Sequence, residues 1–112
     1  TAMRGTKGGQ HMSTIDHFVD RTLHADSGDE IGKIRDVLLH PTNLEPEWLV
    51  VKTGWRSGEH LVPIVAVSEQ GDTLVVPYSK TWVDASPRAR DHAPPPTAEA
   101  KATYQHYGLE SP

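Results

Sequence analysis

The chain contains no cysteine, only 6% aromatic residues, and no long apolar run. Without cysteine it forms neither a disulfide nor a thiolate metal site, and it has no cysteine nucleophile. Its apolar runs fall short of the roughly 20 residues that a membrane-spanning helix needs, and a signal-peptide core is absent. These absences predict a cytoplasmic protein without a transmembrane segment.

A strongly basic balance is also missing. The 112 residues carry a formal net charge of −4, and a chain of this length predicts one domain. Acidic residues lie between the basic ones, so a solvated surface of mixed charge is favoured over a nucleic-acid site. The basic positions are Arg35, Lys52, Arg56, Lys80, Arg88 and Arg90.

The sequence divides into three parts. Residues 1–18 are expected to be a disordered arm, and we interpret 1–11 as left over from a cloning vector, with a native flexible arm as the alternative. Residues 19–93 are expected to form a β-domain. Residues 94–112 are expected to form a proline-rich linker and a C-terminal helix.

Short alternating or β-branched runs predict strands at 22–25, 30–39, 47–53, 59–67 and 73–77, with turn signals between them. Their spacing of roughly 8–12 residues is typical of a barrel or a sandwich. Gly32 lies inside the second run, where glycine indicates a sharp bend or a close backbone approach. The alternation slips between Ile34 and Val37, which predicts a bulge. Pro63 interrupts the fourth run and indicates an edge strand or a bulge.

Two helical segments follow the strands. A short turn over 79–85 is expected to place Trp82 and Val83 over the mouth of the barrel. A longer helix is predicted over 97–107, with Thr97 as its N-cap and Gly108 as its stop. Its stripe of Ala100, Tyr104 and Tyr107 needs a docking surface, either on the chain's own barrel or in a homodimer.

The order and spacing of these segments resemble the PRC-barrel family. The matching pieces are GDEIGKIRDV at 28–37, WLVVKTG at 48–54, LVPI at 61–64, DTLVVPYSK at 72–80 and YQHYGL at 104–109. The resemblance implies an all-β fold, a small PRC-like β-barrel of about five to six short strands with a C-terminal α-helix. It also implies a stand-alone bacterial member, frequent self-association and no conserved catalytic motif.

Catalytic and metal chemistry are disfavoured. His17, His24, His40, His60, His92 and His106 lack the paired spacing of metal ligands, so we expect no metal and no cofactor. No Gly-x-Ser-x-Gly elbow is present. Gly28 and Gly32 do not precede a helix, which argues against a nucleotide loop. We therefore expect no enzyme activity.

The aromatic residues are the best candidates for contacts. Trp48 is expected in the core, whereas Trp55 and its neighbour Arg56 lie in a hairpin loop where core packing does not explain a tryptophan. For Trp82, a plug over the barrel mouth is favoured over a dimer seam. The candidate interface is Trp55, Arg56, Trp82, Tyr104 and Tyr107.

The leading hypothesis is a non-enzymatic protein-interaction module that forms a homodimer and binds an unidentified protein partner. One alternative is an RNA-processing or ribosome-associated factor, by similarity to the barrel of the maturation factor RimM. Another is an accessory to a membrane redox complex, by similarity to the barrel of the reaction-centre H subunit. Both alternatives come from the fold resemblance alone.

Overall fold

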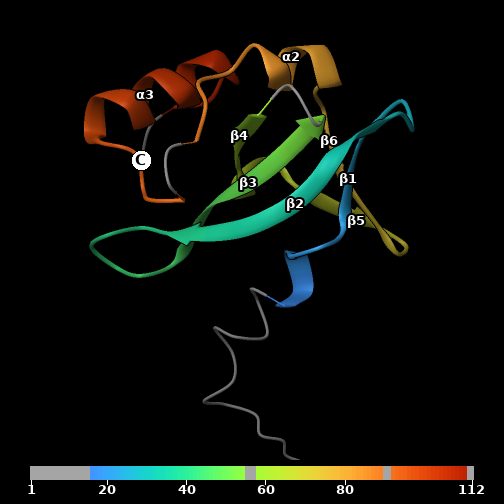
Figure 1. Cartoon of the computed structure of the whole chain (residues 1–112), viewed down its shortest axis with the longest axis horizontal. Helices are drawn as coiled ribbons and strands as arrows, with labels where there is room; N and C mark the ends of the chain where they lie inside the picture. The colour runs from blue at the N-terminus through green and yellow to red at the C-terminus, as the bar shows by residue number, and fades with distance from the viewer. Residues whose placement is uncertain (1–15, 55–57, 90–91, 111–112) are drawn as a thin grey trace, which may run out of the picture.

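Six strands form one curved sheet in the computed structural model, which describes residues 16–54, 58–89 and 92–110 (Figure 1). The spatial order is β4-β3-β2-β1-β6-β5. The strands are β1 (Thr22–Ala25), β2 (Glu30–Leu39), β3 (Pro46–Gly54), β4 (Gly58–Pro63), β5 (Ser68–Gln70) and β6 (Thr73–Val76). The prediction of a mostly β fold with a C-terminal helix is confirmed.

The sheet is antiparallel except where β1 runs parallel to β6. This parallel pair brings the last long strand back beside the first, although they are some fifty positions apart in the chain. Within the described residues, no ladder joins the edge strands β4 and β5. The sheet is curved, as Figure 1 shows, and a fully closed barrel stays a prediction.

Strand β2 bends at two places that the sequence indicates. The register of the β2–β3 ladder shifts between Ile34 and Asp36, which confirms the predicted bulge. At Gly32, a Cβ atom would overlap the carbonyl oxygen of Lys52 and would lie 2.9 Å from the Cα atom of Thr53. Gly32 is thus required because the backbone of β3 passes directly against it.

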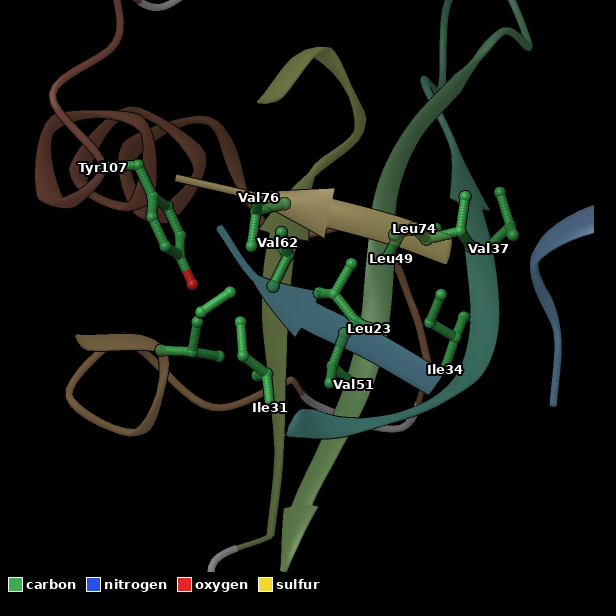
Figure 2. Packing of buried hydrophobic residues seen from close by; sticks show 12 residues of the cluster. Leu23, Ile31, Ile34, Val37, Leu49, Val51, Val62, Leu74, Val76 and Tyr107 are labelled. Atoms are coloured by element: carbon green, nitrogen blue, oxygen red, sulfur yellow. The ribbon is translucent and has the colours of Figure 1, made fainter. Parts of the chain in front are cut away.

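The concave inner face of the sheet holds the main core. Its side chains come from all the longer strands and are almost fully buried (Figure 2). Helix α2 (Lys80–Asp84) adds Val83 to this cluster, and Tyr107 reaches into it from the end of helix α3 (Thr97–His106). Phe18 and Val19 pack against the same cluster from the N-terminal side.

Two parts of the chain differ from the sequence expectations. The strand predicted over 59–67 is wrong beyond Pro63, where the chain forms a 3-10 turn, η2 (Ile64–Ala66), and then the unpredicted strand β5. Thr97 is the first helical residue and not the N-cap of α3, because Pro96 occupies the cap position without a side-chain hydrogen bond. Gly108 ends the helix with a φ of 73°, as expected.

Candidate functional site: the covered outer face of the sheet

The convex outer face of β2–β4 carries a second apolar cluster. Trp48 and Val50 on β3, Leu61 on β4 and Leu38 on β2 are all at most 5% exposed. Burial on this face requires a cover, because alternate residues of β3 already fill the inner core. The cover is the C-terminal segment 92–110, called the strap below, whose helix α3 lies across the sheet in Figure 1.

Tyr104 provides the central contact between the strap and the outer face. Its ring lies 4.6 Å from the ring of Trp48, centroid to centroid, at an interplanar angle of 40°. Its hydroxyl donates a hydrogen bond of 2.8 Å to Oε2 of Glu47. Burial and this carboxylate raise the pKa of Tyr104 well above its ordinary value of 10.0. The predicted docking of the Ala100–Tyr104–Tyr107 stripe is confirmed, and it occurs within the chain.

Tyr107 secures the C-terminal end of the strap. It is 4% exposed, and its hydroxyl donates to the carbonyl oxygen of Leu61 at 2.7 Å. Its own carbonyl accepts a hydrogen bond of 2.8 Å from the hydroxyl of Tyr78. Burial raises the pKa of both phenols above the ordinary value.

Trp82 and His106 form a reciprocal pair that joins α2 to α3. The two rings are stacked, with centroids 4.6 Å apart and an interplanar angle of 16°. The indole Nε1 of Trp82 donates to the carbonyl oxygen of His106 at 3.0 Å, and Nε2 of His106 donates to the carbonyl oxygen of Trp82 at 2.7 Å. These contacts fix both rings, yet the side chain of Trp82 remains 48% exposed.

An open pocket of about 530 Å³ lies beside this pair. We call its surface the aromatic shelf, which is formed mainly by Pro77, Tyr78, Trp82, Gln105 and His106. The hydroxyl of Tyr78, the indole N–H and the imidazole N–H are all used inside the chain. The shelf therefore offers rigid aromatic surface, and it also carries the exposed amide of Gln105.

The proposed plug role of Trp82 is wrong. Val83, the next residue, is 0% exposed and belongs to the inner core, whereas Trp82 points toward solvent and His106. Successive residues of a helix differ by about 100° in direction, and α2 is rotated so that Val83 faces the core while Trp82 lies to the side of it. Ser79 caps α2 by accepting a hydrogen bond from the backbone N–H of Trp82.

The other candidate interface residues fall into two groups. Tyr104 and Tyr107 are buried inside the chain, so their aromatic rings serve the strap. Trp55 and Arg56 lie outside the described residues. Trp48 is confirmed as a core residue at 0% exposure, and its Nε1 has no hydrogen-bond partner among the described residues.

A charged contact at the start of the strap was not anticipated from the sequence. Nδ1 of His92 lies 3.0 Å from Oδ2 of Asp36, and Nε2 lies 2.7 Å from Oε1 of Glu59. The Glu59 hydrogen bond is the largest cause that raises the pKa of His92 above its ordinary value, and Asp36 adds to it. No spacing signal reveals this cluster, because 56 and 33 positions separate His92 from its partners.

The buried polar groups act in structural roles. Nδ1 of His60 donates to the carbonyl oxygen of Ser86 at 2.9 Å, and the hydroxyl of Ser86 donates to the carbonyl oxygen of Val83 at 2.7 Å. Thr53 donates to Asp84, which ties α2 to the sheet. Within 16–54, 58–89 and 92–110, no group of three or more potential ligands is placed to hold a metal ion. No helix in these ranges is long and apolar enough to cross a membrane.

The fold and the covered site define a small curved-sheet domain closed by short helices. The family model for the PRC-barrel domain matches residues 12–83, well over half of the chain, so the chain belongs to the PRC-barrel family. The match ends at α2, and the strap lies beyond it. No curated protein matches the chain significantly.

Proposed function

We propose that this protein is a non-enzymatic protein-interaction module that self-associates through the aromatic shelf. The exposed, immobilised ring of Trp82 is the observation that supports this function most directly. A half-exposed tryptophan has a large apolar surface in water, and tryptophan is enriched among the residues that dominate interface energies. Its stack on His106 holds the ring in place before any partner arrives, which lowers the entropy cost of binding.

The chemistry of the shelf favours a contact surface over a reaction site. The hydroxyl of Tyr78, the indole N–H of Trp82 and the Nε2–H of His106 all donate within the chain, so the shelf presents mainly aromatic surface. The membership in the PRC-barrel family agrees with a binding role. In a two-fold dimer, the same surface of each copy would face its equivalent, and two rigid aromatic shelves would bury each other.

Sedimentation equilibrium over a concentration series tests this proposal. We expect a reversible dimer that Trp82→Ala weakens by about tenfold or more, since truncating a central tryptophan typically costs 2 kcal/mol or more. Leu44→Ala is the matched control, because Leu44 is 57% exposed and lies in the β2–β3 loop away from the shelf. A strict monomer at high concentration would refute self-association.

A second variant changes the proposed dimer contact without removing a hydrogen bond that anchors the strap. Gln105 lies on the shelf but makes none of the anchoring hydrogen bonds of Trp82 and His106. Gln105→Glu should weaken the dimer through charge repulsion across the two-fold axis while the unfolding midpoint stays unchanged. An unaltered dimer in both Trp82→Ala and Gln105→Glu would place the contact elsewhere on the surface.

The ribosome-associated and membrane-redox roles have no specific support in the geometry. A fully closed barrel also lacks specific support in the geometry, and we retain it as an expectation from the family. Co-sedimentation with ribosomes at moderate salt would favour the first role, since simple phosphate attraction weakens steeply as salt rises.

A further inference from the structure

His92 lies where the strap enters the outer face, and both of its ring nitrogens face carboxylate oxygens. Asp36 belongs to β2 and Glu59 to β4, so one imidazole spans two strands that flank β3. The distances of 3.0 and 2.7 Å are those of hydrogen bonds. The contact therefore ties the beginning of the strap to the sheet at two points.

Two hydrogen bonds from His92 to carboxylates require a proton on each of its ring nitrogens. A neutral imidazole carries one N–H and one lone pair, so in either tautomer one ring nitrogen would present its lone pair to a carboxylate oxygen. Only the imidazolium donates to both carboxylates. His92 contacts the two carboxylates of Asp36 and Glu59. Among the described residues, two cations lie close to the Glu59 end of this contact: Lys52 on β3, which pairs in register with Glu59, and Arg88, whose guanidinium lies against Gly58.

The segment around His92 connects the sheet to the start of α3. Just before it, the backbone N–H of Ala89 donates to the carbonyl oxygen of Glu59 at 2.8 Å. Just after it, Ala93 and three prolines lead into α3, and such a segment is stiff and extended. A stiff connection of this length couples the placement of His92 to that of the first helical turn.

We propose that His92 is a proton-operated latch that fastens the N-terminal half of the strap over the outer face of the sheet. Protonation closes the latch, and deprotonation weakens it. Because contact with the two carboxylates raises the folded pKa, the stabilisation is full below the unfolded pKa and is lost as pH rises through the folded pKa. The tyrosine anchors at the other end remain, so the opening is local to the start of the strap.

Amide hydrogen exchange followed by NMR measures this opening directly. The N–H of Ala100 donates to the carbonyl oxygen of Pro96 at 2.8 Å and reports on the start of α3. The N–H of Leu109 donates to the carbonyl oxygen of Tyr104 at 2.9 Å and reports on its end. The ratio of the two protection factors cancels the general acceleration of exchange with pH.

In the wild type, we expect protection at Ala100 relative to Leu109 to fall about threefold to tenfold as pH rises from about 5 to 9, the modest range expected for a partly exposed ion pair. His92→Gln should show low relative protection throughout. Glu59→Gln should be less pH dependent, because a glutamine amide can donate to a neutral ring nitrogen. His17→Gln is the matched control, because His17 also contacts a carboxylate, that of Glu69 at 2.9 Å, but lies outside the strap.

The imidazole titration completes the test. The pKa of His92 should lie above its ordinary value of 6.5 and should fall in Glu59→Gln and in Asp36→Asn. The latch is refuted if relative protection at Ala100 is flat with pH in the wild type. It is equally refuted if His92→Gln behaves as the wild type, or if the pKa of His92 is ordinary or lower.

Discussion

Replacing Tyr104 with alanine removes the ring that holds the strap against Trp48. A buried aromatic side chain withdraws about 150–250 Å² from water, which corresponds to about 4–6 kcal/mol at about 25 cal/mol per Å². Alanine retains part of this surface, so we expect the free energy of unfolding to fall by about 3–5 kcal/mol. Tyr104 is 3% exposed and its ring lies 4.6 Å from that of Trp48, which places it in the upper part of that range.

Urea denaturation followed by tryptophan fluorescence and by circular dichroism measures the change. Tyr104→Phe keeps the ring contact and loses the hydrogen bond to Glu47, so it should cost only about 0.5–1.5 kcal/mol. Lys101→Ala, on the exposed side of α3, should stay within about 0.5 kcal/mol of the wild type. A Tyr104→Ala variant as stable as Lys101→Ala would show that α3 does not cover the sheet.

Three further predictions concern the sheet, the tyrosines and the α2–α3 pair. Gly32→Ala should lower the free energy of unfolding, measured by thermal unfolding, by more than about 4 kcal/mol, because the added Cβ meets the backbone of β3. At Gly71 an added Cβ meets no atom within 4 Å, so Gly71→Ala should cost only about 1–2 kcal/mol, and equal losses in the two variants would contradict the packing. The pKa of each tyrosine is raised, so absorbance at 295 nm should show no phenol ionising near pH 10 in the folded protein, and the free energy of unfolding should fall as pH rises above 10. An ionisation step near pH 10 in the folded protein would contradict the burial of these phenols. His106→Ala should increase the rate of proteolytic cleavage within the strap, whereas His40→Ala should not; equal rates in the two variants would argue against the anchor.

Much of the architecture follows from local sequence patterns. Alternation and β-branched residues locate the long strands, and Gly32 marks the close approach that the β3 backbone makes. The stripe of Tyr104 and Tyr107 predicts a docked helix, because those positions share one helical face. These features are readable because each depends on residues a few positions apart.

The remaining features depend on tertiary placement. Strand β5 consists of three exposed residues, so no hydrophobic pattern announces it. The burial of Val83 and the exposure of Trp82 depend on how α2 is rotated, which a five-residue helix does not encode by periodicity. The His92 cluster joins strands far apart in the sequence, and single-chain spacing rules for histidine do not apply to it.

We propose above that the aromatic shelf, which α2 and the end of α3 form together, is the contact surface of the protein. NMR spectra of the wild type recorded over a concentration series locate that surface residue by residue. We expect concentration-dependent shifts at the indole N–H of Trp82 and at the amides of Tyr78 and Gln105, with none at Leu44. Shifts confined to other parts of the chain, or none at millimolar concentration, would contradict it.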